Sequence, residues 1–88
     1  MAYTVLLTRS ARKELQALPE QARNRVFTDV AALEEDPRPC GCVKYRGQDE
    51  DAYRIVVGEY RVLYLVDDDT REVRVFRIRH RSKAYRPF

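Results

Sequence analysis

The side chains best suited to chemistry are arginines in two parts of the chain, together with one histidine and one tyrosine. Arg54 and Arg61 lie in a run of alternating apolar and polar residues, and Arg79-His80-Arg81-Ser82-Lys83-Ala84-Tyr85 lies close to the C-terminus. A guanidinium group binds phosphate through paired hydrogen bonds, whereas an imidazole or a phenol can transfer a proton. Together these groups suit a site that grips, and could cleave, a phosphodiester.

The positive charge of the chain is concentrated near its C-terminus. The 88 residues carry a net charge of +3, whereas residues 70–88 hold seven cations against one acid, a net charge of +6. A local excess of this kind is typical of surfaces that bind a phosphate backbone or an acidic partner. The alternative is a solvated strand edge on which arginines prevent aggregation. Because the cations continue past the expected strand, we favour a binding surface.

Length and composition limit the class of protein. A chain of 88 residues forms one domain, residues 1–88, and its small core favours a stabilising partner. It lacks both the ~18 consecutive apolar residues of a membrane helix and a signal-peptide pattern, so we expect a cytoplasmic protein with no membrane partner. Cys40 and Cys42 have no further Cys or His at metal-binding spacing, and the acidic triplets 49–51 and 67–69 belong to separate loops. We therefore predict neither a metal site nor a cofactor.

The first half of the chain predicts one strand and a pair of helices. Residues 3–7 are apolar and partly β-branched, which is typical of a strand. Thr8 or Ser10 can cap the next helix, and Pro19 suits the start of a second one. One face of the first helix holds Ala11, Leu15 and Leu18, and one face of the second holds Ala22, Val26, Val30 and Leu33.

The second half predicts an antiparallel meander. Its strands cover about 52–57, 60–66 and 72–79, after a short strand near 43–46. Gly58-Glu59 is a two-residue turn with glycine first, and its register places one apolar face under the helices. That face holds Tyr53, Ile55, Val57, Tyr60, Val62, Tyr64 and Val66. The fold class is therefore α+β, with an N-terminal strand and a two-helix hairpin packed on an antiparallel sheet.

The other face of the meander should carry the candidate site. Alternation places Arg54, Val56, Arg61, Leu63 and Leu65 there. A second turn centred on Asp68-Asp69 would bring Phe76 beside Arg61, and Arg79 and His80 to the same end of the sheet.

The whole chain resembles the RelE/ParE superfamily of toxins from type II toxin–antitoxin modules. The resembling segments are Tyr3-Thr4-Val5 with Thr8, Ala11, Lys13, Leu15 and Leu18-Pro19; Lys44-Tyr45-Arg46-Gly47; Tyr53-Arg54-Ile55 with Gly58-Glu59-Tyr60-Arg61-Val62-Leu63-Tyr64; and Arg79-His80-Arg81 with Tyr85. The resemblance implies a RelE-like fold, related to microbial RNases. It also implies a ribosome-dependent mRNA endoribonuclease that inhibits translation and is neutralised by a cognate antitoxin protein.

The resemblance also assigns residue roles. Arg61 is similar to the family's phosphate-contacting arginine, Arg79 to its C-terminal catalytic arginine, and Tyr85 to the tyrosine that stacks on or orients the substrate. Arg54 stands where the best-known members have a catalytic lysine, and Val56 where they have a second cation. The same resemblance makes the remaining cations RNA-binding candidates: Lys44, Arg46, Arg77, Arg81 and Lys83.

RNA cleavage without a metal needs a base for the 2′-OH, charge stabilisation at phosphorus and a proton for the 5′-oxygen. Arg61 and Arg79 suit the second task. His80, the only histidine, is the candidate base on its ordinary pKa of about 6.5, unless it only orients the chain end. Tyr85 serves as a base if nearby cations lower its pKa, and otherwise packs the tail.

Three functions stay open at this point. The first is a ribosome-dependent endoribonuclease, which the Arg79-His80-Arg81…Tyr85 ending favours. The second is a ParE-type inhibitor of DNA gyrase without nuclease activity, which would not need that ending. The third is a toxin-like domain that has lost its activity and serves only as a partner or repressor component.

Overall fold

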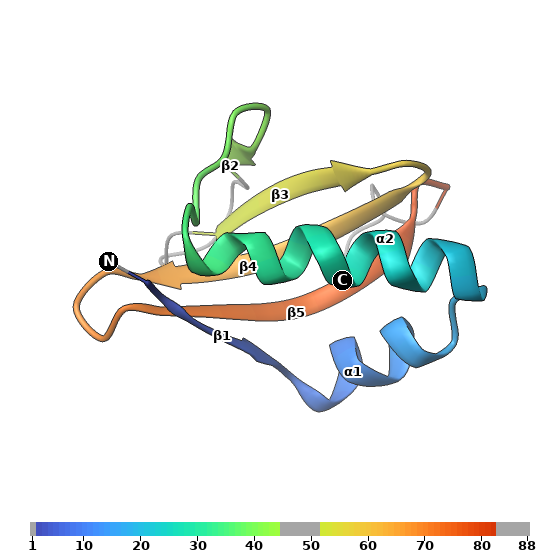
Figure 1. Ribbon diagram of the computed structural model, residues 1–88, viewed down its shortest axis with the longest axis horizontal. Helices are drawn as coiled ribbons and strands as arrows, with labels where there is room; N and C mark the ends of the chain where they lie inside the picture. Colours follow the sequence, from blue (N-terminus) through green and yellow to red (C-terminus); the bar gives the residue numbers. More distant parts are fainter. Residues whose placement is uncertain (1, 45–51, 83–88) are drawn as a thin grey trace.

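The two halves of the chain fold into a helix pair and a sheet that share one core (Figure 1). The computed structural model describes residues 2–44 and 52–82. Their elements are β1 (Thr4–Leu7), α1 (Arg9–Gln16), α2 (Glu20–Ala31), the 3₁₀ helix η1 (Ala32–Glu34), β2 (Val43–Lys44), β3 (Ala52–Val57), β4 (Tyr60–Asp67) and β5 (Glu72–His80). The strands form one sheet in the order β1-β5-β4-β3-β2, which confirms the predicted α+β class.

Local sequence signals explain the helices. The hydroxyl of Thr8 accepts a hydrogen bond from the Ala11 N–H at 3.2 Å, so Thr8 rather than Ser10 caps α1. Pro19 occupies the N-cap position of α2. Neither α1 nor α2 is long and apolar enough to cross a membrane, within the part of the chain that the structure describes.

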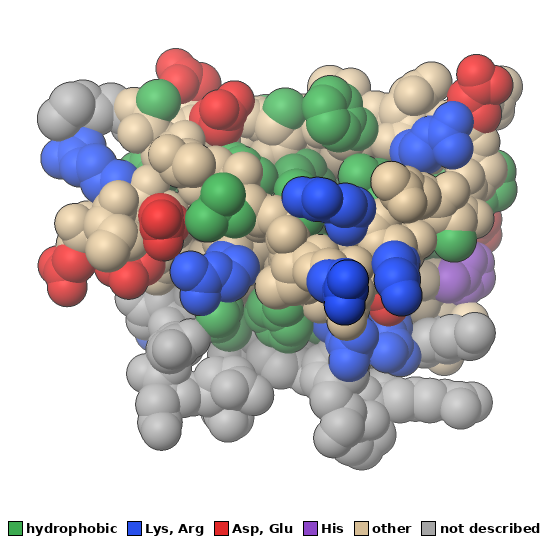
Figure 2. All heavy atoms as spheres, turned by 90° about the horizontal axis from the view of Figure 1, so that it is seen from below, with side chains coloured by type: hydrophobic (Ala, Val, Ile, Leu, Met, Phe, Trp, Pro, Cys, Tyr) green, Lys and Arg blue, Asp and Glu red, His purple; other side chains and the backbone are tan. Residues whose placement is uncertain are grey.

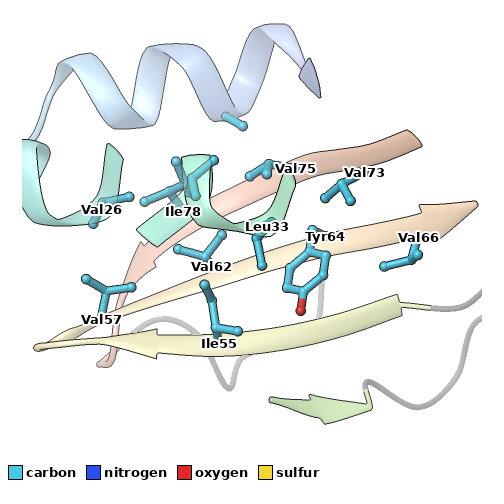
Figure 3. Close-up of a cluster of buried hydrophobic side chains, with 12 residues drawn as sticks. Val26, Leu33, Ile55, Val57, Val62, Tyr64, Val66, Val73, Val75 and Ile78 are labelled. Carbon is cyan, nitrogen blue, oxygen red and sulfur yellow. The ribbon is translucent and has the colours of Figure 1, made fainter. Parts of the chain in front are cut away.

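The first hairpin of the meander forms as predicted. Gly58 adopts a φ of 60°, and Val57 pairs with Tyr60, Ile55 with Val62 and Tyr53 with Tyr64. The predicted apolar face packs against the helices, where Val26, Leu33, Val62 and Tyr64 converge (Figure 3). Tyr53 and Tyr60 pack at the border of this core.

The second turn differs from the prediction. Asp67 pairs with Glu72, so the turn contains residues 68–71 and not a two-residue centre. The Asp67 carboxylate accepts the N–H groups of Asp69 and Thr70, at 2.9 and 3.2 Å, and Arg71 adopts a φ of 57°. These side-chain hydrogen bonds favour the wider turn.

A β-bulge in β5 shifts its register with β4 by one more residue. Tyr64 pairs with Val75, whereas the preceding Leu63 pairs with Arg77, which leaves Phe76 as the extra residue of β5. The prediction that Phe76 lies beside Arg61 is therefore wrong, because Arg61 pairs with Arg79. The bulge also reverses the alternation of β5, so that the residues after it change faces.

The sheet is mixed, because β1 joins it in the parallel direction. Thr4 pairs with Glu72 and Leu7 with Val75, which places β1 at the outer edge of β5. The sequence predicted the strand at residues 3–7 but not its partner. β1 ends at Leu7, and β5 continues beyond it toward α1 (Figure 1).

Polar contacts of Tyr64 and Arg38 hold the loop after the helices against the sheet. The fully buried Tyr64 donates its hydroxyl to the Pro37 carbonyl at 2.8 Å, and burial raises the pKa of Tyr64 well above its usual value. Arg38 holds both carboxylate oxygens of Asp68, at 3.2 and 2.9 Å, and donates Nε–H to the Tyr53 hydroxyl at 2.9 Å. The Arg38 guanidinium lowers the pKa of Asp68, so the carboxylate stays charged.

We expect Tyr64→Phe to lower the free energy of unfolding by about 1–2 kcal/mol, because the buried Pro37 carbonyl loses its donor while the ring packing is kept. Urea denaturation followed by circular dichroism measures this. Tyr3→Phe is the control, because it removes an exposed hydroxyl that donates to Asp68, and its effect should stay within ~0.5 kcal/mol. Equal stabilities of Tyr64→Phe and the wild type would contradict the expectation.

Candidate functional site

Four arginines surround Leu63 on the face of the sheet that α1 and α2 do not cover. In one row Arg54 of β3 pairs with Leu63 of β4, which pairs with Arg77 of β5. In the next row Arg61 pairs directly with Arg79. Since residues two apart on a strand share a face, the four guanidinium-bearing side chains lie on one face. We call Arg54, Arg61, Arg77 and Arg79 the arginine patch.

The bulge at Phe76 creates this arrangement. Before it, Val73 and Val75 point into the core; after it, Ile78 does. Without the extra residue, Arg77 and Arg79 would share the face of Val73 and Val75, because they are an even number of residues away. Bulges next to functional sites commonly re-aim side chains in this way.

The members of the patch are partly withdrawn from solvent. All four arginines are half-buried, and Leu63 between them is fully buried. Partial burial strengthens electrostatic interactions relative to those of exposed side chains. Four guanidinium groups on one face of adjacent strands attract an anion. A phosphate group that contacts two guanidinium groups at once is the natural ligand.

His80 lies apart from the patch. It follows Arg79 on β5 and pairs with Tyr60, and its ring stacks edge-on against the Tyr60 ring with centroids 5.5 Å apart. Its Nδ1 accepts the Ser82 N–H at 3.2 Å and lies 3.0 Å from the Ser82 hydroxyl. The prediction that both residues reach one end of the sheet is confirmed, but alternation directs the imidazole to the opposite face from Arg79. These contacts suit the role of orienting the chain end.

The other predicted residues divide into three groups. Val56 lies beside Arg61 in the patch and is half exposed, at 51%. Lys44 pairs with Tyr53, so its register position belongs to the other face, and Arg81 is exposed in the turn after β5. Arg46, Lys83 and Tyr85 lie outside the described residues. On the face shown in Figure 2, several Lys and Arg side chains gather to the right of centre, near the single histidine.

One residue near the patch was missed by the sequence reasoning. This residue is Glu14 of α1. Its Oε2 lies 3.5 Å from Nε of Arg79 and 3.8 Å from a terminal nitrogen of Arg77. A signal was present, because Glu14 falls between Ala11 and Leu15 on the inward side of an amphipathic helix. A carboxylate there needs a partner.

Comparison with known proteins agrees with this geometry. The family model described as "ParE toxin of type II toxin-antitoxin system, parDE" matches residues 5–85. The chain belongs to the RelE/ParE superfamily of type II toxin–antitoxin toxins. It is 33% identical over 87 residues to the toxin RelG of Mycobacterium tuberculosis, covering 98% of this chain and 99% of RelG.

Solved RelE structures share the fold of this RelE-like toxin. The RelE–RelB complex of Pyrococcus horikoshii matches with a TM-score of 0.82 and 30% identity, covering 96% of this chain and 100% of the other. The isolated RelE toxin of Escherichia coli matches with a TM-score of 0.79 and 26% identity, covering 96% and 89%. The close agreement over nearly the whole chain confirms the RelE-like fold.

The arginine patch should bind a polyanion in solution. Inorganic tripolyphosphate at about 100 times its Kd should stabilise the protein by ~2.7 kcal/mol, which corresponds to roughly 10–20 °C in Tm for a domain of this size. Arg61→Ala and Arg79→Ala should each reduce the shift. Arg12→Ala is the matched control, because Arg12 is exposed on α1 and lies two residues from Glu14, on another side of the helix. Equal shifts in all variants, measured by thermal unfolding, would show that the anion binds elsewhere.

Proposed function

We propose that this RelE-like toxin is an endoribonuclease that cleaves messenger RNA on the ribosome and thereby inhibits translation. The observation that carries the proposal is the direct pairing of Arg61 with Arg79, flanked by Arg54 and Arg77. Two half-buried guanidinium groups on adjacent strands carry two positive charges, which complement the two negative charges of the pentavalent intermediate formed when the 2′-oxygen attacks a phosphodiester. The RelE relatives support the same activity class.

The proposed reaction divides between charge stabilisation and proton transfer. The 2′-oxygen attacks the adjacent phosphorus as its proton leaves, and the bond from phosphorus to the 5′-oxygen breaks as that oxygen gains a proton. Arg61 and Arg79 stabilise the negative charge of the pentavalent intermediate through bidentate hydrogen bonds. Arg54 and Arg77 hold the flanking backbone.

Tyr85 is our candidate for proton transfer, because the contacts of His80 with Tyr60 and Ser82 direct its ring away from the patch. The remaining cations that we assign to RNA contact are Lys44, Arg46, Arg81 and Lys83.

Val56 explains why such a site would depend on the ribosome. It occupies a position beside Arg61 where a further cation would touch the same phosphate. A site with fewer groups for proton transfer relies more on positioning, and well-oriented reactants can gain several kcal/mol from positioning alone. The ribosome supplies that orientation by holding the message in a fixed conformation.

We propose that a cognate antitoxin protein binds and neutralises the toxin. The solved structures that this chain resembles include RelE–RelB complexes. On this chain, Phe27, Val43 and Val56 expose apolar side chains to the extent of 62%, 48% and 51%. A groove of about 520 Å³ adjoins Val56, and α2, η1 and β3 contribute to its walls. The exposed apolar side chain of Val56 beside this groove suits a protein-binding surface.

A second candidate is inhibition of DNA gyrase without RNA cleavage. The matching family model is that of the ParE toxin, and Val56 lowers the number of cations in the patch. A gyrase inhibitor would share the scaffold but would not need Arg61 opposite Arg79.

Expression of the chain in bacteria should arrest protein synthesis while DNA supercoiling stays normal. Amino-acid incorporation and plasmid topology after induction measure the two effects in the same culture. Co-expression of the protein encoded by the adjacent gene should restore growth if that protein is the antitoxin. Collapsed supercoiling with unaffected incorporation would identify the gyrase inhibitor instead.

Arg61→Ala and Arg79→Ala should each slow single-turnover cleavage of mRNA on programmed ribosomes by about 10²–10³-fold, because each removes a charge-stabilising donor. Arg12→Ala should cut at the wild-type rate. His80→Ala should cost less than either patch variant, and Val56→Lys should raise the rate by adding a cation next to Arg61. Circular dichroism checks that each variant is folded. Wild-type rates for folded Arg61→Ala and Arg79→Ala would exclude the arginine patch as the site.

A further inference from the structure

Beyond the end of β1, strand β5 has an edge that none of the strands in residues 2–44 and 52–82 covers. The last backbone contact with the β1 side is the Thr8 N–H to the Val75 carbonyl, at 2.9 Å. The chain then turns into α1, which packs against β5 (Figure 1). Backbone groups on such an edge need other partners, because a buried N–H without an acceptor is costly. The edge is the one that presents Arg77 and Arg79.

Glu14 of α1 supplies the missing acceptor. Its Oε1 accepts the backbone N–H of Ile78 at 2.8 Å, and its Oε2 lies 3.5 Å from Nε of Arg79 and 3.8 Å from Arg77. One carboxylate therefore contacts three consecutive residues of β5. It holds the backbone at Ile78 and the side chains on both sides of it.

The contact is more than a solvated surface ion pair. The exposed fractions of the side chains are 25% for Glu14, 28% for Arg79 and 30% for Arg77. Exposed ion pairs contribute little because water and salt screen them and because both side chains lose freedom. Here the backbone hydrogen bond already fixes the carboxylate, so less freedom is lost when it binds the arginines.

We propose that Glu14 is a positioning residue for RNA cleavage, which holds the Arg79 guanidinium in the orientation that receives the scissile phosphate. The inference rests on the proposed function. Glu14 contacts Arg79 at Nε, and a guanidinium has five N–H donors in a planar fork. This ion pair restrains the guanidinium and hence the direction of its remaining donors. The negative charge also offsets the repulsion between Arg77 and Arg79, which share a face two residues apart.

The positioning role predicts a separation of rate from binding. Loss of the carboxylate charge makes the patch more positive, so RNA should bind at least as tightly. Arg79 would lose its ion pair with Glu14, so the chemical step should slow. A misplacement of about 1 Å in a catalytic group costs up to ~10²-fold in rate. A residue with only a structural role would not produce opposite changes in these two quantities.

The test compares Glu14→Gln with Glu72→Gln. Glutamine at position 14 keeps an oxygen to accept the Ile78 N–H and has nearly the same size, so the variant should fold, but it lacks the charge. Glu72→Gln is the matched control, because it removes the same charge at a distant place. Glu72 forms an ion pair with Arg74, at 3.5 Å, near the other end of β5. We expect single-turnover cleavage on programmed ribosomes to fall by roughly 10- to 100-fold for Glu14→Gln and to stay unchanged for Glu72→Gln. Affinity for an RNA with a 2′-deoxy group at the cleavage position should be equal or higher in both.

Arginine NMR tests the contact independently of activity. The Nε–H signal of Arg79, assigned by its loss in Arg79→Lys, should exchange with water faster in Glu14→Gln than in the wild type or in Glu72→Gln. Equal exchange in all three proteins would overturn the inference. The inference would also be overturned if Glu14→Gln cleaved at the wild-type rate while Arg79→Ala was inactive. That result would leave the proposed function intact. Absence of cleavage by the wild type would instead refute the proposed function, and with it the positioning role in cleavage.

Discussion

The structure of the candidate site depends on one extra residue in β5. Phe76 forms a bulge opposite the Leu63–Tyr64 step, and everything beyond it changes faces. After Val73 and Val75, the next residue of β5 in the apolar core is Ile78 and not Arg77. Arg77 and Arg79 therefore lie on the same face of the sheet as Arg61. A shift of one residue in a strand exchanges its two faces, so the bulge serves both the core and the arginine patch.

The sequence predicted the parts of the fold that local patterns control. The alternation of apolar residues and the Gly58-Glu59 turn were enough to predict the first hairpin. Thr8 and Pro19 were enough to predict where the two helices begin. The wide turn at 68–71 was missed because hydrogen bonds of the Asp67 carboxylate compete with strand pairing there. The bulge at Phe76 was missed as well. The parallel pairing of β1 with β5 has no local signal at all. The pairing of Arg61 with Arg79 was therefore not predicted, and the roles assigned to the candidate residues stay predictions.

In the arginine patch, the positive charge that suits phosphate binding lowers the stability of the fold. Four half-buried arginines surround Leu63, and within the described residues the carboxylate of Glu14 contacts two of them, Arg77 and Arg79. A fully neutralised patch would be more stable but would hold no phosphate. Proteins commonly accept a cost in stability at functional sites. Binding partners that bring negative charge, whether RNA or an acidic protein segment, would bind the same positive charge and therefore compete for one surface.

The parallel pairing of β1 with β5 has a consequence for how the chain folds. Thr4 pairs with Glu72, so the first strand to be synthesised completes the sheet only with the last. Contacts between residues so far apart in sequence slow folding, because a long loop must close before they form. The arginine patch also requires β5. A nascent chain therefore carries no assembled arginine patch until β5 has been synthesised.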